Sequence, residues 1–588
     1  MEINRIDPSY WFASLKRNEL QLLVYGNGLK GGTVETTIPH TGITVKECLC
    51  DKYLLVTIKL CCQVPAGKYF ISFHSEKDGT ASIPYEFKPR SPWGENGGAT
   101  LSNRDALYMV MVDRFAKGGI RSSAEEDNNP NSWHGGNILG MKNALPYLRR
   151  LGITALWHSP IFKNSEYHGY SITDHYDVDG HFGTKEGYAD FVDEAHRNGI
   201  KVVADFIFNH CSIAHPWVVS PPLEDWFNGK RGKSIVTTNY RQTTIFDPYA
   251  SGFDRKKTVE GWFTEKMPDL NLKSPYVFSY LLEMSIWWIE TFRIDAIRMD
   301  TYLYSDLDAM IEWQRLISEE YPGFSVIAET WIGDAAYTAK VQRYVRQRLD
   351  ANSSFIVMDF AFQGHIDACF NRFKVPDKEA QVYQHFVYDF LYDEPQSTLA
   401  FLDNHDLPRW CSRIKGKAKL QQALAVLLTS PRIPQIYYGT EFMFAGDGKG
   451  TGDGNYRQDA FQILDSPDVM AAGVVPFLRK ILEWRKGSRA VTKGRMKHFI
   501  PQQGVYVYFR QYGDEKVMVV VNGTSKRVDI DLSQYVEELD GYTLGIDVIT
   551  DKKMRLDTPS FRVKSNNVLI LNLGYYDGRG YSYGIMQD

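Results

Sequence analysis

Several acidic side chains in this sequence stand at the ends of short apolar runs, together with an arginine and two histidines. They are Asp205, His210, Arg298, Asp300, Glu329, His405 and Asp406. Carboxylates repel one another, so a fold gathers several of them mainly at a working site. Glycoside hydrolysis needs such a pair, and the two groups stand about 5–5.5 Å apart when the anomeric configuration is retained. Arg298, two residues before Asp300, would favour an ionised nucleophile there.

Eight short apolar runs, separated by longer helical patterns, must position these residues. The runs are Leu107–Val112, Thr154–Trp157, Lys201–Phe208, Ile294–Met299, Ser325–Ala328, Phe355–Met358, Leu399–Leu402 and Gln435–Tyr438. Eight buried strands that alternate with helices predict an α/β fold, a (β/α)8 TIM barrel, over residues 100–485. Active sites of such barrels lie at the carboxyl ends of the strands, where the acids stand here.

Other segments of the chain depart from this alternation. Residues 1–95 and 490–588 alternate apolar and polar positions between Gly, Pro and Asn, which predicts an N-terminal and a C-terminal β-sandwich domain. Residues 211–265 are rich in Pro, Trp, Asn and Gly and predict a subdomain inserted on the third βα loop. The stretch Pro89–Gly98 is rich in Pro and Gly, which interrupt helices and strands, and so predicts a linker.

The composition is that of a folded globular protein. Of the 588 residues, 43% are hydrophobic and 23% charged, and the net charge of −4 gives no general attraction for nucleic acid. The aromatic content of 14% suits a neutral ligand with flat apolar faces, and equally a large core. No apolar run reaches the roughly 20 residues of a membrane span. Four of the seven cysteines lie beside predicted strands and are expected to be buried thiols: Cys48, Cys50, Cys61 and Cys62.

Taken in their order and spacing, the motifs resemble the α-amylase family of glycoside hydrolases over nearly the whole chain. They are Gly152–Pro160, Asp205-x-x-x-Asn209-His210, Asp295-Ala-Ile-Arg298-Met-Asp300, Glu329-Thr-Trp331, Phe401–Asp406 and Ile433–Glu441. The resemblance implies Asp300 as nucleophile, Glu329 as general acid/base and Asp406 as the stabiliser of the transition state. It also implies substrate-binding roles for Tyr170, Asp205, His210, Arg298, Trp331, His405, Asp453 and Arg457.

The nucleophile depends on a choice of register, because Arg-x-Asp occurs twice. Arg293-Ile-Asp295 and Arg298-Met-Asp300 both fit the short pattern. We choose Asp300, because Asp295 to Asp300 then match the longer family pattern, Asp-Gly-aromatic or apolar-Arg-apolar-Asp, with Ala296 in place of Gly as the one difference. The other register would start the strand inside a helix predicted over Val277–Glu290.

Finer features resemble one branch of the family. Met267-Pro-Asp-Leu-Asn271 and the extra N-terminal β-domain are similar to the neopullulanase, cyclomaltodextrinase and maltogenic amylase branch, and especially to neopullulanases of bacterial starch-utilisation systems. The resemblance implies pullulan, cyclodextrins, maltooligosaccharides or starch as substrates. It also implies a periplasmic location after signal removal, with a cytoplasmic one left open, and a possible homodimer.

Calcium is the one metal that the resemblance raises, and no cofactor is required. Where branch members carry calcium ligands, this chain has Lys117-Gly118-Gly119 and His134-Gly-Gly-Asn137. Calcium prefers several oxygen ligands with negative charge, so this pattern predicts a lost or altered site. Asp127, Asn128 and Asn129 could still offer oxygens.

Other functions stay open at this level. The same chemistry would serve an α-glucosyl transferase or an oligo-1,6-glucosidase, and a protein of this fold that has lost catalysis would be a glycan binder. His210, His405 and the acids could also suit a metal hydrolase. In the N-terminal domain Trp11 and Phe12 are candidate glucan contacts, although core packing is the favoured interpretation.

Overall fold

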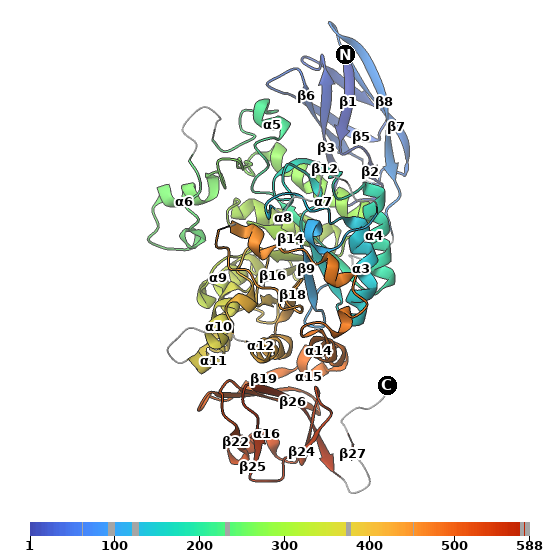
Figure 1. Ribbon diagram of the computed structural model, residues 1–588. Coiled ribbons are helices and arrows are strands. Elements are labelled where there is room, and N and C mark those ends of the chain that lie inside the picture. The colour runs from blue at the N-terminus through green and yellow to red at the C-terminus, as the bar shows by residue number, and fades with distance from the viewer. Residues whose placement is uncertain are drawn as a thin grey trace.

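The computed structural model describes residues 1–61, 63–91, 100–119, 129–229, 236–371, 378–414, 416–450, 452–576 and 581–582. Figure 1 shows three parts along the chain: paired N-terminal sheets at one end, a barrel in the middle and a C-terminal sheet at the other end. Most of the predicted linker, along with Cys62, Asp127 and Asn128, lies outside the described residues.

The central strands close into the predicted eight-stranded barrel, and all neighbouring pairs are parallel. The strands are β9 (Leu107–Val110), β10 (Ala155–His158), β13 (Lys201–Ile207), β14 (Ala296–Asp300), β15 (Ser325–Ala328), β16 (Ser354–Met358), β17 (Thr398–Phe401) and β18 (Ile433–Tyr437). Nearly every residue in them is buried, because helices cover the outside and side chains fill the inside.

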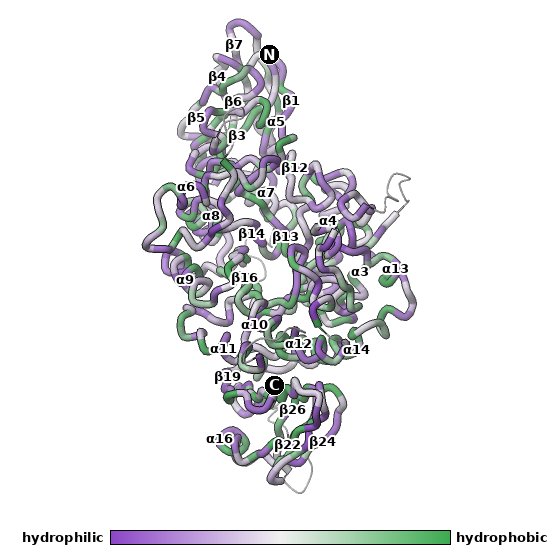
Figure 2. Tube along the Cα trace, turned by 60° about the vertical axis from the view of Figure 1, so that its left-hand side comes forward, coloured by the Kyte–Doolittle hydropathy of each residue, from purple (hydrophilic) through white to green (hydrophobic). Residues whose placement is uncertain are grey.

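Helices surround the barrel between successive strands. The longer ones are α3 (Ile138–Leu151), α4 (Lys185–Arg197), α7 (Pro275–Phe292), α8 (Leu307–Glu320), α9 (Ala335–Arg346), α10 (Phe360–Phe370), α12 (Lys417–Thr429) and α14 (Val475–Gly487). Helix α7 starts two residues before the predicted helix, because Pro275 occupies its first turn, where a missing N–H costs nothing. Figure 2 shows hydrophobic stretches along α7 and α12, which pack into the core.

Two insertions rise from the carboxyl face of the barrel. The first is a hairpin after β10, made of β11 (Phe162–Asn164) and β12 (Ile172–Val178), which the sequence pattern did not indicate. The second is the long segment between β13 and α7, which carries α5 (Pro216–Val219) and α6 (Gly252–Glu260) and projects beside the barrel in Figure 1. Trp217, Trp226 and Trp262 are buried within it.

The N-terminal domain is a pair of four-stranded sheets. One contains β1 (Glu2–Asp7), β3 (Glu19–Asn27), β6 (Tyr53–Leu60) and β5 (His40–Glu47), and the other β2 (Trp11–Phe12), β8 (Gly79–Lys88), β7 (Gly67–Ser75) and β4 (Thr33–Thr36). Trp11 and Phe12 are buried in its core, which confirms core packing as their role. The expectation of buried thiols is right for Cys48 but wrong for Cys50 and Cys61, which are half-buried.

The C-terminal domain is a larger sheet with a two-stranded ribbon against it. The sheet contains β19 (Arg495–His498), β20 (Val505–Tyr512), β21 (Glu515–Asn522), β26 (Asn567–Tyr576), β23 (Leu544–Asp547), β24 (Lys553–Arg555) and β27 (Tyr581–Ser582), and the ribbon β22 (Val528–Asp531) and β25 (Ser560–Val563). Tyr506 and Tyr508 belong to the barrel's core, whereas Val505 and Val507 belong to the domain's own core. Successive side chains of a strand point to opposite faces, so one face of the sheet covers the barrel.

In the part of the chain that the structure describes, no helix is both long enough and apolar enough to cross a membrane.

Candidate active site

The predicted site residues meet at the carboxyl ends of the barrel strands, around a cavity of about 660 Å³. Strand β14 supplies Asp300, the residue after β15 is Glu329, and the loop after β17 supplies Asp406. Nine of the eleven predicted residues line this cavity: Tyr170, His210, Asp300, Glu329, Trp331, His405, Asp406, Asp453 and Arg457. The remaining two, Asp205 and Arg298, are fully buried next to it and contact residues that line it.

The aspartates of the two Arg-x-Asp motifs, Asp300 and Asp295, lie at opposite ends of β14. Asp300 lies at the end of β14 and lines the cavity. Asp295 precedes the strand at its amino end, where its carboxylate accepts from the Val202 backbone N–H at 2.7 Å and contacts His196 Nε2 at 2.8 Å. The chosen register therefore brings Asp300, and not Asp295, to the other acids.

Arg298 joins three carboxylates through one guanidinium. Its Nη1 donates to Asp300 Oδ1 at 2.7 Å and to Asp205 Oδ1 at 3.0 Å, and its Nη2 lies 2.7 Å from Glu329 Oε1. Trp157 packs against it, with the guanidinium carbon 5.1 Å from the ring centroid. The planar fork of arginine suits this bridging, since an ammonium is a single point charge.

Glu329 has the environment of a group that keeps its proton. Burial raises the pKa of Glu329 to about 8, and the nearby carboxylates of Asp300 and Asp406 add to the rise while Arg298 opposes it. Its Oε2 also accepts from the Thr301 backbone N–H at 2.7 Å. A carboxyl that stays protonated at neutral pH can act as a general acid.

A second cluster of polar side chains holds Asp406 at the cavity. Arg457 Nη2 donates to Asp406 Oδ1 at 2.9 Å, and His405 Nε2 lies 3.1 Å from Asp406 Oδ2. The Tyr170 hydroxyl donates to Asp205 at 2.9 Å, and its ring stacks on His405 with centroids 5.3 Å apart. Asp453 is more exposed, and its carboxylate lies 3.5 Å from Arg457.

His210 lines the cavity with a neutral, buried ring. Burial lowers the pKa of His210 to about 4, so its ring is neutral at neutral pH. Its Nε2 is buried and has no hydrogen-bond partner within the described ranges. The Phe263 ring stacks on the imidazole at 5.1 Å and fixes its plane.

The inserted segment adds a wall that sequence reasoning missed. Tyr240, Phe263 and Thr264 come from this segment, and Thr301 and Tyr304 follow Asp300. The rings of Phe263 and Tyr304 meet edge to face at 5.5 Å. Loop residues carry no periodic pattern, so only the position of Thr301 and Tyr304 directly after the nucleophile strand could have indicated them.

Trp331 lies at the mouth of the cavity and is 46% exposed. The Phe360 ring stacks beneath it at 5.1 Å and only 10° from parallel, which leaves one indole face to solvent. Such a supported, half-exposed ring is a flat platform for a ligand face.

Two of the stretches named for an altered calcium site lie among the described residues, and both side chains at issue have other contacts. The Asn137 side chain caps α3, where its Oδ1 accepts from the Gly140 and Gly118 backbone N–H groups. The Lys117 ammonium lies 4.7 Å from the centre of the Phe461 ring, and places a positive charge beside this region. Among the residues that the structure describes, no three His, Cys, Asp or Glu side chains group in a way that could hold a metal ion, and that includes those of the cavity.

Comparison with known proteins agrees with this arrangement. The sequence matches the family described as alpha amylase, catalytic domain over residues 109–510, cyclomaltodextrinase, N-terminal over 5–91 and the cyclo-malto-dextrinase C-terminal domain over 496–572. The chain is similar to a cyclomaltodextrinase of Geobacillus thermopakistaniensis, at 27% identity over 72% of this chain and 69% of that one. It is similar to neopullulanase 2 of Thermoactinomyces vulgaris, at 27% over 72% and 69%.

A solved structure shares the architecture as well. The alpha-amylase of Geobacillus thermoleovorans, complexed with acarbose, superposes with a TM-score of 0.68 at 27% identity, and covers 81% of this chain and 99% of that one. The sequence matches and the eight-stranded barrel with its two β domains lead to one conclusion. The chain belongs to the alpha-amylase family of glycoside hydrolases and is of the cyclomaltodextrinase and neopullulanase type.

Proposed function

We propose that this enzyme hydrolyses α-glucans with retention of configuration, through Asp300 as nucleophile and Glu329 as general acid/base. The observation that carries the assignment is the shared guanidinium: Asp300 and Glu329 each lie 2.7 Å from a nitrogen of Arg298 at the wall of the cavity. Two carboxyl groups on one guanidinium are close neighbours, as a retaining mechanism requires.

The chemistry follows in two steps. Asp300 attacks the anomeric carbon while Glu329 gives its proton to the departing glucosidic oxygen, which leaves a covalent glucosyl ester. Glu329, now ionised, removes a proton from water, and the water oxygen displaces Asp300 with a second inversion. The pKa of Glu329 at about 8 supports the first step, since the acid holds its proton at neutral pH.

The other residues would bind and stabilise the reacting sugar. In this proposal the Asp406 carboxylate stabilises the positive charge that develops at the anomeric carbon, and His210 Nε2 and His405 bind sugar hydroxyls. Tyr170 and Trp331 offer ring faces, and Asp453 and Arg457 hold the sugar from the loop after β18. Asp205 and Arg298 position these groups from beneath.

The substrate class is proposed from the relatives. Proteins named cyclomaltodextrinase and neopullulanase match over about 70% of this chain. We infer that the enzyme cleaves α-1,4 bonds, and also α-1,6 bonds, of pullulan, cyclodextrins, maltooligosaccharides or starch. Chromatography of the products from pullulan, β-cyclodextrin, amylose and isomaltose tests this. Panose from pullulan would support neopullulanase action, and attack on isomaltose alone would indicate an oligo-1,6-glucosidase.

The same experiment separates two other activities. Products longer than the substrate would indicate an α-glucosyl transferase. If no substrate is cleaved while glucan still binds, the protein is a glycan binder. The Glu329→Gln variant is the control, because it should lose hydrolysis and keep binding.

Two further expectations from the resemblance complete the proposal. A periplasmic location is tested by cell fractionation, and a homodimer by the molar mass in solution. The chain mass is 67.4 kDa, so a measured value near it would exclude the dimer.

A further inference from the structure

An arginine of the N-terminal domain contacts the hairpin that carries Tyr170. Arg5 lies in β1, and its Nη2 donates to Asp174 Oδ1 at 2.7 Å while its Nη1 donates to Asp174 Oδ2. Asp174 lies in β12, four residues after Tyr170. Two parallel N–H···O bonds fix the orientation of a carboxylate as well as its distance. The N-terminal domain therefore holds β12 in a defined position.

Arg5 is itself fixed by its own domain. Its Nε donates to Asp7 Oδ1 at 2.6 Å, and its guanidinium carbon lies 5.3 Å from the centre of the Tyr25 ring. Burial of Asp174 favours the neutral acid, but the hydrogen bonds and charge of Arg5 hold the pKa of Asp174 below its usual value. The pair is therefore ionised at neutral pH, and joins a rigid sheet to the hairpin.

Strand β12 connects this anchor to two side chains of the cavity. Tyr170 precedes the strand by two residues, and its hydroxyl lies 2.7 Å from His405 Nε2. The backbone oxygen of Ile172, the first residue of β12, accepts from the Ser212 N–H at 2.8 Å, and Ser212 follows His210 by two residues. A displacement of β12 would therefore move Tyr170 and His210 together.

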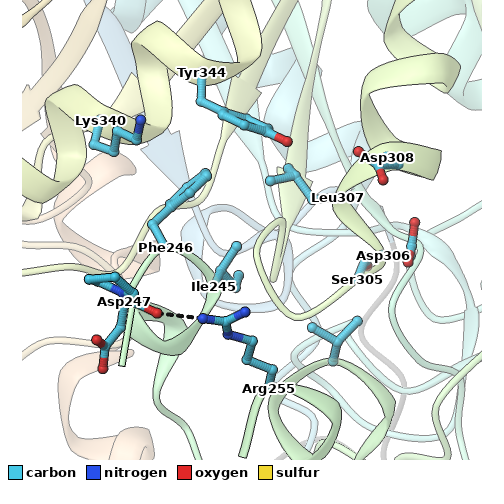
Figure 3. Close-up of a pocket in the computed structure, with 12 residues that line it drawn as sticks. Ile245, Phe246, Asp247, Arg255, Ser305, Asp306, Leu307, Asp308, Lys340 and Tyr344 are labelled. Carbon is cyan, nitrogen blue, oxygen red and sulfur yellow. Dashed lines mark hydrogen bonds between the residues drawn. The ribbon is translucent and has the colours of Figure 1, made fainter. Parts of the chain in front are cut away.

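The inserted segment, which lines the cavity with Tyr240 and Phe263, has a support of a different kind. The Phe246 backbone N–H donates to the Tyr337 hydroxyl at 2.8 Å, and the Phe246 ring lies 4.8 Å from that of Tyr344. Both tyrosines belong to α9, and Figure 3 shows Phe246 beside Tyr344 at a separate pocket of about 480 Å³. This support comes from the barrel itself, whereas the contact with Asp174 comes from the N-terminal domain.

We propose that Arg5 is a positioning residue for substrate binding, which holds the hairpin so that Tyr170 and His210 meet the sugar. The proposal rests on the proposed function, which assigns these two side chains to sugar binding. Arg5 does not line the cavity, so it acts through Asp174 and not by touching the substrate. The N-terminal domain thereby contributes to affinity within a single chain.

Calorimetric titration with maltoheptaose distinguishes positioning from structural damage. The titration uses the Glu329→Gln variant as parent, because that variant should leave the ligand uncleaved. It gives both the Kd and the number of sites per chain. A misfolded fraction lowers the number of sites and leaves the Kd of the remaining ones unchanged. Arg5→Met in this parent should instead raise the Kd about 10-fold at an unchanged number of sites, since displaced groups lose contact with the ligand.

Arg90→Met is the matched control. Arg90 also joins the N-terminal domain to the barrel, through Glu290 Oε1 of α7 at 2.8 Å and Glu320 Oε1 of α8 at 2.5 Å. Neither partner belongs to the hairpin, so the Kd should stay that of the parent. Arg17→Met is a milder second control, since Arg17 Nη2 lies 3.8 Å from Glu283 Oε1 of the same helix α7.

The partner of Arg5 supplies an independent variant. Asp174→Asn in the same parent should raise the Kd by a similar factor. Its combination with Arg5→Met should add little, because both substitutions break the same contact. Arg5→Lys should recover part of the affinity, since an ammonium restores the charge but not the two parallel hydrogen bonds.

The outcomes separate this proposal from the proposed function. A rise in Kd confined to the variants of Arg5 and Asp174, at an unchanged number of sites, supports positioning. Equal Kd values for Arg5→Met and the parent, with or without a loss of sites, would overturn it, as would an equal rise with Arg90→Met. Failure of the proposed function has another signature, because the parent itself would then bind no maltoheptaose.

Discussion

Asp300 Oδ1 lies 2.7 Å from Nη1 of Arg298, two residues earlier on strand β14. Residues i and i+2 of a strand point to the same face, so both side chains point into the barrel. The same guanidinium contacts Asp205 and Glu329, which makes Arg298 the common partner of three buried carboxyl groups.

The register of the nucleophile is tested by two matched substitutions. Asp300→Asn should lower kcat/KM by about 10⁴-fold or more, because an amide cannot form the ester intermediate. Asp295→Asn alters the contacts with Val202 and His196 at the other end of the strand, and should act on stability more than on turnover. Steady-state kinetics on one maltooligosaccharide with both variants gives the answer, and the opposite ranking would assign the role to Asp295.

The pH dependence of the rate reports Glu329. Because its pKa is about 8, the acid is protonated at neutral pH and loses its proton as the pH rises through 8. The value of kcat/KM should therefore fall on the alkaline side of the profile with a midpoint near pH 8. A rate that stays constant to pH 10 would show that Glu329 is not the acid. Retention of circular dichroism at each pH controls for unfolding.

The same shift predicts a stability effect. The pKa of Glu329 is about 8 in the folded enzyme and about 4.3 in the unfolded chain. As the pH rises, the unfolded chain therefore releases this proton first. The folded enzyme therefore loses stability between about pH 4 and pH 8 through this group. Glu329→Gln removes that loss. The melting temperature of the variant should equal that of the unchanged enzyme at pH 4 and exceed it at pH 8. A difference that does not vary with pH would contradict the shift.

Trp331 is expected to act in binding. Trp331→Ala removes the exposed ring face that Phe360 supports, and should raise KM for maltooligosaccharides about 10-fold, in line with about 1.4 kcal/mol of ring contact. Trp331→Phe keeps a flat ring and should recover most of the affinity. Equal KM values for the alanine variant and the unchanged enzyme would exclude the platform role.

The N-terminal domain offers a test of core packing against glucan binding. Trp11 is completely buried, so Trp11→Ala should lower the free energy of unfolding by about 3–5 kcal/mol. Phe70, in the same domain, is 51% exposed, and Phe70→Ala should change it by about 0.5 kcal/mol or less. Denaturant unfolding measures both, and equal effects would refute the core assignment.

Much of the barrel could be predicted because its strands are short, continuous apolar runs with polar residues at one end. The run Ser325–Ala328 matches β15 residue for residue, and Glu329 follows it as predicted. The carboxyl ends of parallel strands meet at one face of a barrel, so the sequence alone places the residues there close together.

The loops could not be predicted in this way. The hairpin that carries Tyr170 and the wall with Tyr240 and Phe263 depend on contacts between segments distant in sequence, which no local pattern encodes. Burial of Cys50 and Cys61 was misjudged, since a position beside a strand does not fix how far a side chain is exposed.

The measurement that tests the central claim most directly is a proton NMR time course of maltooligosaccharide hydrolysis. If Asp300 forms a covalent intermediate, the first product signal is that of the α-anomer, and the β-anomer appears only later by mutarotation. The Asp300→Asn variant should give neither signal. Initial release of the β-anomer, or release of product by the variant, would contradict the account.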